Sequence, residues 1–323
     1  MSNEMKPMTT GSGTATFANP DDYQAGILGA SVNLILTGGD FKARLTWLNL
    51  HHLHVLRGNE NLPRIAYISL TPARVFVSFL ARVGPPSTYS GAELRFGDIV
   101  FHRRGERLHH RTPRENQWGL ISLPPDQLAA CGKALTGLEI FAPPASRMLR
   151  PSRDVAARLL RLHSRACHLA ETRHELFANP EVARSLEQEL LHALINCLTA
   201  DDAGGKPETR QRHADIMVQF EEALAAQSGR PPSMPELCAD IGVPERTLRI
   251  CCAEFLDMSP TRYLLLRRLN AARSALLRAD PATASVAEVA RGHHFLELGR
   301  FAVTYRTVFG EMPSTTLRRS PAE

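Results

Sequence analysis

The chain has 323 residues, of which 43% are hydrophobic and 22% charged, with a formal net charge of +5 and a pI near 9.0. This length exceeds that of a typical single domain, and the composition is that of a globular protein that buries ordinary cores. No run approaches eighteen uninterrupted apolar residues, and Met1–Lys6 lacks the apolar stretch of a signal peptide. We therefore expect two domains, no membrane partner and a cytoplasmic location.

Positive charge is concentrated in two stretches. Residues 246–319 hold 12 arginines against 6 acidic residues, and residues 41–114 hold 12 Lys or Arg against 4 acidic residues. The later stretch suits a nucleic-acid partner, whereas the earlier one indicates either an anionic ligand or a solvated surface. The six cysteines show no C-x-x-C spacing and are interpreted as buried thiols in a reducing compartment; a redox role for the adjacent Cys251 and Cys252 stays open.

The N-terminal half has the pattern of many short strands. Residues 1–20 have a loop-forming composition and predict a disordered tail. From Ile27 to Leu123, β-rich runs alternate with turn residues, as in Phe41–Trp47, where apolar and polar side chains alternate. Strands at this spacing predict a compact β-sandwich or barrel within a domain at residues 21–200.

Two amphipathic helices are predicted to follow the strands, over Pro151–Leu169 and Pro180–Leu198. Their apolar residues recur every three or four positions, and the opposite faces are charged. Either both helices cover the open side of the barrel, or one of them forms a dimer interface. Residues 201–208, which are polar and contain two glycines, are predicted to be the interdomain linker.

The last third of the chain contains two helix-turn-helix patterns, at residues 233–249 and 285–301. Each opens with Ser-x-x-Glu, the capping box that satisfies free N–H groups at a helix start. The predicted recognition helices span 245–255 and 296–308, and a central helix over 260–279 joins the two motifs. Two such motifs are typical of a protein that reads two neighbouring major grooves on one face of DNA.

This region resembles the AraC/XylS family of bacterial transcription regulators. The resemblance rests on Ala239, Gly242 and Leu248, and above all on the block Leu298–Ser314, which follows the family's C-terminal signature. It covers about residues 210–319 and implies an AraC-type DNA-binding domain at residues 209–323. It also implies that residues 21–200 form an effector-sensing and dimerisation domain of cupin-like shape. The expected fold is therefore α+β, with a strand-rich barrel or sandwich, flanking helices and an all-α double helix-turn-helix domain.

The resemblance also implies which side chains contact DNA. Predicted base contacts are Glu245, Arg246, Arg249, Ile250, Glu297, Leu298, Gly299, Arg300 and Thr304. Arginine suits bidentate pairing with O6 and N7 of guanine. Predicted phosphate contacts, where charge matters more than geometry, are Arg267, Arg268, Arg273 and Arg306.

Three residues depart from the family pattern. Pro244 stands where a Ser or Thr usually caps the first recognition helix, so the side-chain cap is lost. Ile250 occupies a position that is often Arg. His294 occupies a turn position that usually holds Gly, which implies either a left-handed His or an altered turn. These departures bear on sequence preference and leave the expected fold unchanged.

We expect no enzymatic activity. His52-x-His54 with Glu60 has only a partial likeness to a cupin metal motif, because the spacing to Glu60 is too long and no second motif supplies a further His. No nucleophile elbow, phosphate-binding glycine loop or H-E-x-x-H pattern is present. Accordingly no catalytic residue, metal or cofactor is expected.

The predicted function is a sequence-specific DNA-binding transcription regulator controlled by a small-molecule effector in the N-terminal domain. Candidate effector contacts are Trp47, Tyr67 and Trp118. Expected partners are double-stranded DNA, RNA polymerase and a second copy of the chain. In the alternative hypothesis, the N-terminal domain binds only itself or a protein and no metabolite. An open pocket between the strands would favour the small-molecule effector. A pocket filled by side chains would favour the alternative.

Overall fold

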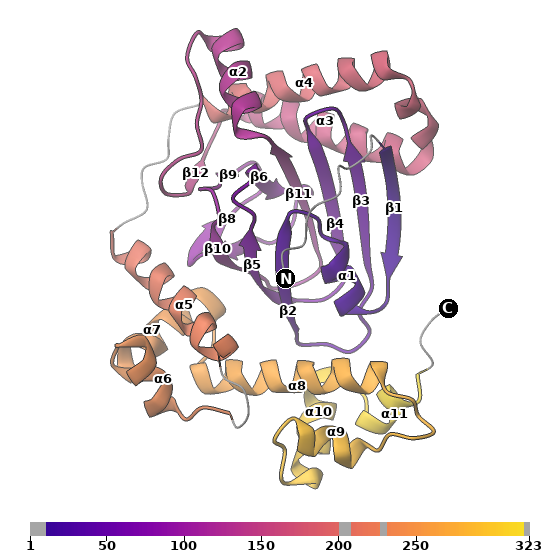
Figure 1. Cartoon of the computed structure of the whole chain (residues 1–323), viewed down its shortest axis with the longest axis vertical. Helices are drawn as coiled ribbons and strands as arrows, with labels where there is room; N and C mark the ends of the chain where they lie inside the picture. Colours follow the sequence, from indigo (N-terminus) through magenta and orange to yellow (C-terminus); the bar gives the residue numbers. More distant parts are fainter. Residues whose placement is uncertain (1–10, 200–207, 227–230, 320–323) are drawn as a thin grey trace.

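The N-terminal half of the protein is a sandwich of two antiparallel sheets (Figure 1). The computed structural model describes residues 11–199, 208–226 and 231–319. The larger sheet contains, in spatial order, β1 (Gly11–Phe17), β3 (Ala43–Asn49), β4 (His54–Glu60), β11 (Asn116–Leu123), β6 (Val75–Leu80), β9 (Ile99–Phe101) and β12 (Arg147–Leu149). The smaller sheet contains β2 (Ala30–Leu36), β5 (Arg64–Leu70), β10 (Arg107–Thr112), β7 (Ser87–Tyr89) and β8 (Ala92–Leu94). The predicted strand-rich sandwich is confirmed.

The first strand corrects the prediction of a disordered tail. β1 pairs with β3 along its whole length, from Gly11 opposite Asn49 to Phe17 opposite Ala43. Helix α1 (Pro20–Gly26) follows at once. The prediction is wrong for residues 11–20 because pairing with a neighbouring strand outweighs their loop-forming composition; residues 1–10 lie outside the described residues.

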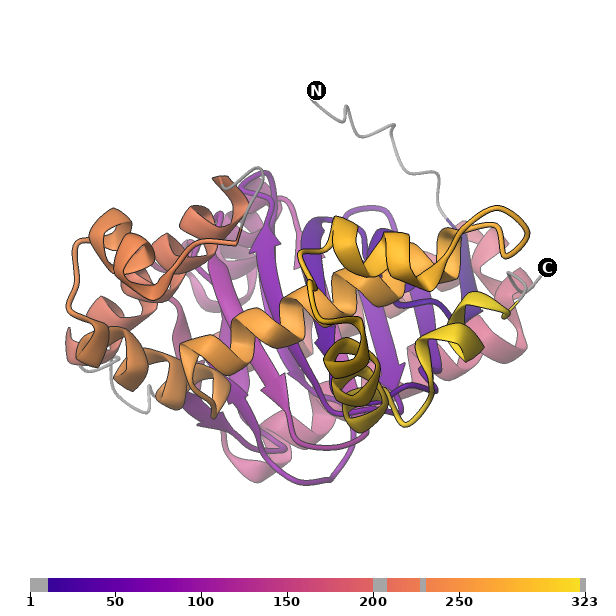
Figure 2. The same ribbon diagram turned by 90° about the horizontal axis from the view of Figure 1, so that it is seen from below.

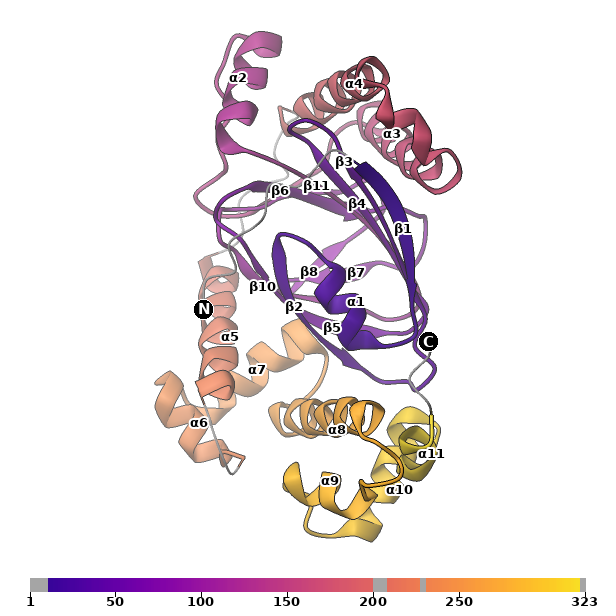
Figure 3. The same ribbon diagram turned by 45° about the vertical axis from the view of Figure 1, so that its right-hand side comes forward.

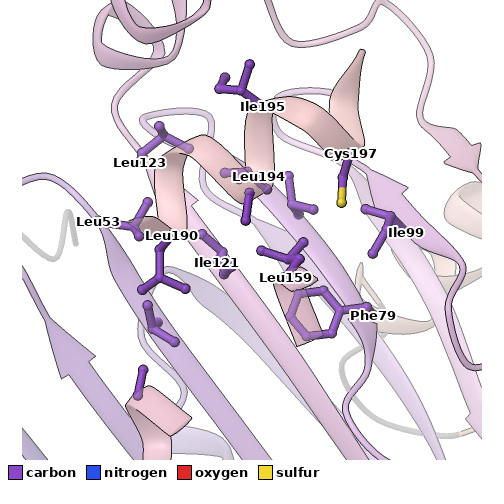
Figure 4. Close-up of a cluster of buried hydrophobic side chains, with 14 of the residues drawn as sticks. Leu53, Phe79, Ile99, Ile121, Leu123, Leu159, Leu190, Leu194, Ile195 and Cys197 are labelled. Atoms are coloured by element: carbon purple, nitrogen blue, oxygen red, sulfur yellow. The ribbon is translucent and has the colours of Figure 1, made fainter. Parts of the chain in front are cut away.

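The outer face of the larger sheet is covered by helices, as Figure 1 shows. They are α2 (Pro125–Thr136), α3 (Arg153–Thr172), the short 3-10 helix η1 (His174–Ala178) and α4 (Pro180–Leu198). In the core beneath them, Leu159, Leu190 and Leu194 pack against Phe79 and Ile121 of the sheet, all at most 1% exposed (Figure 4). The two predicted amphipathic helices are therefore confirmed, and both cover the sheet.

The C-terminal third is all-α. Its helices are α5 (Glu208–Ala226), α6 (Met234–Ile241), α7 (Glu245–Leu256), α8 (Pro260–Arg278), α9 (Val286–Gly292), α10 (Leu298–Phe309) and α11 (Pro313–Leu317). The predicted α+β fold is confirmed. The predicted linker, residues 201–208, lies outside the described residues except for Glu208, which begins α5.

The central helix α8 lies along the outer side of the smaller sheet, with the two helix-turn-helix units at its opposite ends (Figures 2 and 3). Ile35 of β2 and Ile65 of β5 belong to the same apolar cluster as Phe255 and Leu269 of the helical part. The helical part and the strand-rich part therefore share a core. Among the described helices, none combines the length and the apolar character that a membrane span requires.

Candidate nucleic-acid interface

The first helix-turn-helix unit is formed by α6 and α7. Ser233 and Glu236 form the predicted capping box, in which the Glu236 N–H donates to Ser233 Oγ and the Ser233 N–H donates to Glu236 Oε2. Gly242 ends α6 with φ of 71°, the left-handed conformation predicted for the turn. Pro244 is the N-cap of α7 and, as expected, its ring supplies no capping oxygen.

The second unit, α9 and α10, repeats this design with a different turn. Ser285 and Glu288 form its capping box, with the Glu288 N–H 3.1 Å from Ser285 Oγ. His294 adopts φ of 61°, so the left-handed His is found rather than an altered turn. Arg268 of α8 supports this turn, because its guanidinium donates to the carbonyl oxygens of His293 and His294 and stacks 4.4 Å from the Phe295 ring centroid.

On α7 the predicted base-contacting residues share one exposed face. Glu245, Arg246, Arg249 and Ile250 are all exposed, whereas Leu248 on the opposite side is fully buried. Arg249 is held by Glu245, whose Oε1 accepts from Arg249 Nη2 at 2.6 Å. Arg246 presents its guanidinium to solvent on the same face. The face therefore combines two arginines and one apolar side chain within a single turn.

The predicted base-contacting residues at the start of α10 and along it differ in their exposure to solvent. Glu297, Gly299 and Arg300 are exposed, but Leu298 and Thr304 are half-buried. The Thr304 hydroxyl donates to the carbonyl oxygen of Arg300 at 2.8 Å, and Leu298 packs against the helical core. Their side chains are therefore less available to a base than predicted.

Two strongly exposed residues of this second unit were missed by the sequence analysis: Leu296 is 87% exposed and Val303 68%. The sequence could have predicted the exposure of Val303, because this residue follows Gly299 by about one helical turn and therefore lies on the same outward face.

Three of the four predicted phosphate contacts are engaged within the protein. Arg267 pairs with buried Glu221, and Arg268 holds the turn of the second unit. Arg273 is 4% exposed and pairs with Glu311 at 2.9 Å. Arg267 and Arg273 are therefore less available to a phosphate than predicted, because each is paired with a carboxylate of the protein. Arg306 is exposed and stays a candidate.

The candidate effector residues do not meet in one pocket. The cavity between the sheets has a volume of about 70 Å³, and Trp118 lines it while donating to Glu60 Oε1 at 2.9 Å. Trp47 is half-buried against the apolar cluster that contains Leu70 and Phe76, and it is not among the residues that line the cavity. Tyr67 lies on the other side of its strand, with its ring 5.0 Å from that of His109 at the contact with the helical part. Alternation along β5 predicts that neighbours face opposite ways, but it does not say which face is inside.

Neither a metal cluster nor a reactive thiol is found among the described residues. No three His, Cys, Asp or Glu side chains gather as a metal site there. Cys251 and Cys252 lie on the buried face of α7, and burial raises the pKa of Cys251 to about 11 and that of Cys252 further. Thiols with raised pKa values are poor nucleophiles at neutral pH, so the pair does not have the character of a redox switch.

Comparison with known proteins agrees with this geometry. The family model described as "Helix-turn-helix domain" matches residues 237–319. The chain is 31% identical to the "Probable thc operon regulatory protein" of Rhodococcus erythropolis over 61% of this chain and 58% of that protein. It is 42% identical to the "XylDLEGF operon transcriptional activator" of Pseudomonas putida over 20% of each chain. Residues 237–319 therefore belong to this helix-turn-helix family, as the resemblance to AraC/XylS regulators predicts.

These relatives are named as regulators of operons, which agrees with the regulatory role predicted from the sequence. The chain matches less than two thirds of the length of these curated relatives. Among solved structures, the chain is similar to the "AraC-like transcriptional activator CuxR", at 15% identity over 80% of this chain and 93% of that one, with a TM-score of 0.42.

Proposed function

We propose that this chain is a transcription regulator of the AraC/XylS family that binds duplex DNA sequence-specifically, using α7 and α10 in two adjacent major grooves. The observation that carries the proposal is the pair of helix-turn-helix units at the two ends of α8, each with an exposed outward face on its second helix. The 19 residues of α8 correspond to about 28 Å. This length is close to the roughly 34 Å that separates successive major grooves on one face of DNA.

Within this proposal, α7 and α10 have different chemistry. α7 offers Arg246 and Arg249 to base edges, and guanine is the base that arginine pairs with bidentately. α10 offers Arg300 together with Gly299 and the N-terminal residue Glu297. Arg306 and Arg291 are exposed, and neither forms an ion pair with another of the described residues, so we propose them as phosphate contacts.

We further propose that the chain activates transcription as a homodimer, with RNA polymerase as partner. The support is the name of the Pseudomonas putida relatives, which are transcriptional activators. For dimerisation, α3 and α4 present charged outer faces, where Arg165 of α3 is exposed. Sedimentation of the full chain at micromolar concentration tests this part: a monomer would remove it.

The size of the cavity between the sheets helps to decide whether the N-terminal domain binds a small-molecule effector or only dimerises or binds a protein. A volume of about 70 Å³ is smaller than the roughly 150 Å³ cavity that admits benzene, so an aromatic metabolite does not fit there in this conformation. The interior favours the alternative, in which the N-terminal domain dimerises or binds a protein. A cleft of about 1200 Å³ between the strand-rich part and Arg319 is lined by Lys42 and Arg44, with Asp22 and Glu115 also in its wall. We propose this cleft as a candidate site for an effector that carries an anionic group.

Thermal-shift screening of small carboxylates distinguishes these two hypotheses. A ligand of the cleft should raise the unfolding temperature of the protein, and Arg44→Ala should abolish that increase because it removes a cation from the wall. A screen in which no compound stabilises the protein would favour the alternative.

DNA binding itself is tested by selecting binding sites from random duplexes with the full-length protein. We expect an enriched sequence with two half-sites one helical turn apart, each specific base pair contributing about 1–3 kcal/mol. Arg246→Ala should lower the affinity for the selected sequence, whereas Arg104→Ala, which removes an exposed arginine of the strand-rich part, should not. Equal affinity for random and selected duplexes would contradict the proposal.

A further inference from the structure

Two exposed apolar side chains occupy the same place in the two recognition helices. Ile250 is the sixth residue of α7 and Val303 is the sixth residue of α10. They are 48% and 68% exposed, while Leu248 and Phe301, two positions earlier in each helix, are buried. Both side chains therefore point away from the protein core.

Neither helix formation nor packing explains these residues. Isoleucine and valine are branched at Cβ and have lower helix propensity than the alanine or arginine that an exposed helical position usually accepts. Their burial against the protein is incomplete, so most of the apolar surface of Val303 faces solvent. An apolar side chain placed twice at equivalent outward positions indicates a contact with a partner at both places.

Gly299 gives an independent indication of a close partner. It lies in the first turn of α10, one turn before Val303 on the same exposed face. Among the described residues, no atom outside the helix would lie within 4 Å of a Cβ built at Gly299. The protein itself therefore does not require glycine here, although glycine costs helix stability relative to alanine. Because Gly299 has no side chain, another molecule has room to approach the backbone of α10 at this position.

The charged residues beside Ile250 and Val303 indicate what kind of partner these two helix faces contact. Arg300 and Arg306 are exposed beside Val303, as are Arg246 and Arg249 beside Ile250. An apolar strip between arginines is complementary to a major groove, where phosphates flank the base edges. There the C5-methyl group of thymine is the apolar group that a base edge presents, and apolar side chains are its partners.

We propose that Ile250 and Val303 each contact a thymine C5-methyl group, one in each of the two adjacent major grooves. This inference rests on the proposed DNA binding and adds a specificity determinant to it. Because the two residues hold equivalent positions, the two thymines should lie about one helical turn apart, or roughly 10 base pairs. Gly299 allows the backbone of α10 to lie close to the base edges at its half-site.

The test replaces each thymine of the selected site, one at a time, by deoxyuridine, which removes only the C5-methyl group. With the full-length protein we expect one sensitive thymine in each half-site. Affinity there should fall about three- to fivefold, the size expected for one buried methyl group. A selected site at which no replacement changes affinity would overturn the inference while leaving the proposed function intact.

Variants assign each thymine to its side chain. Val303→Ala should abolish the deoxyuridine effect in one half-site only, and Ile250→Ala should abolish it in the other. Val83→Ala, which shortens a valine of similar exposure (71%) in the strand-rich part, should behave as the unchanged protein. The inference is wrong if Val303→Ala and Ile250→Ala keep both effects. Failure to find any preferred sequence would instead refute the proposed function, and with it this inference.

Gly299→Ala supplies a separate readout. Alanine favours the helix, so the unfolding temperature should be unchanged or higher. The affinity for the selected site should nevertheless fall, because the added methyl group enters the space reserved for DNA. Unchanged affinity would show that α10 does not approach the base edges closely.

Discussion

The side-chain amide of Asn270 bonds with both backbone groups of Leu36. Its Oδ1 accepts from the Leu36 N–H at 3.0 Å, and its Nδ2 donates to the Leu36 carbonyl oxygen at 3.0 Å. Leu36 ends β2, the edge strand of the smaller sheet, so α8 satisfies groups that a further strand would otherwise pair. Through this contact the helix that joins the two DNA-reading units is fixed to the strand-rich domain.

Asn270→Ala should weaken this attachment. Both backbone groups of Leu36 lose a partner at a half-buried position, which costs about 1–3 kcal/mol for each group that water does not reach. We expect a lower free energy of unfolding and faster hydrogen exchange of the Leu36 amide. Ala271→Ser, on the exposed side of α8, is the control and should change neither. Unchanged exchange at Leu36 in Asn270→Ala would show that the contact does not form in solution.

A second contact between the two parts is ionic and buried. Glu221 of α5 is 2% exposed, and its carboxylate accepts hydrogen bonds from Tyr263, Arg267 and His109, the last at 2.9 Å. Burial alone would raise the pKa of Glu221, but the His109 hydrogen bond and the Arg267 charge together lower it. The carboxylate is therefore charged at neutral pH and joins β10 to α5 and α8.

Acid should weaken this contact. Because the pKa of Glu221 is lower in the folded protein than its ordinary value of 4.5, the stabilisation is fully present above about pH 4.5 and is lost as the pH falls through the folded value. Glu221→Gln should cost about 3–5 kcal/mol at pH 7, since it leaves Arg267 uncompensated. The difference between the two proteins should shrink below pH 4.5.

Chemical denaturation at pH 7 and pH 4 measures this difference. The control is Glu222→Gln, the next residue of α5, whose ion pair with Arg107 is about half exposed. Such an exposed pair contributes at most about 1 kcal/mol to the free energy of unfolding. Glu222→Gln should therefore cost much less than Glu221→Gln at pH 7, because it leaves the buried cluster around Glu221 intact. Equal costs for Glu221→Gln and Glu222→Gln at pH 7 would contradict the role given to Glu221.

Substitution of a base-contacting arginine and of a phosphate-contacting arginine should affect DNA binding differently. Arg249→Ala should relax the preference at particular base pairs, because its exposed guanidinium lies on the base-reading face of α7. Arg306→Ala should weaken binding to all sequences alike and lower the slope of log affinity against log salt by about one. Fluorescence anisotropy at several salt concentrations, on selected and scrambled duplexes, measures both effects. Identical losses on every sequence for both variants would refute the distinction.

The sequence predicted the helical part closely because its signals are local. The capping box of Ser233 and the proline at the start of α8 locate helix ends within a few residues. The ion pairs that Arg267 and Arg273 form within the protein were not predictable in the same way. Their partners, Glu221 and Glu311, lie 46 and 38 positions away along the chain, so only the tertiary fold reveals that these cations are neutralised.

The strand-rich part was predictable in class but not in detail. Alternation identifies β3 and β5, yet it does not say that Tyr67 faces the helical part while Trp118 faces the cavity. β1 escaped prediction because its glycines and threonines carry little apolar pattern. Its Gly13 instead lies beneath the ring of Trp47, where a Cβ would be 2.5 Å from a ring carbon. Such a contact follows from strand pairing rather than from composition.

The left-handed His294 yields a last prediction about the turn before α10. A non-glycine residue at φ of 61° costs roughly 1–2 kcal/mol, whereas glycine at the same place costs only its larger loss of chain entropy, about 0.5–1 kcal/mol. His294→Gly should therefore raise the free energy of unfolding by up to about 1 kcal/mol. The neighbouring His293 has φ of −101°, so His293→Gly should instead lower it. Thermal or chemical unfolding of both variants measures the two changes, and a loss of stability in His294→Gly as large as that in His293→Gly would show that the turn is not strained.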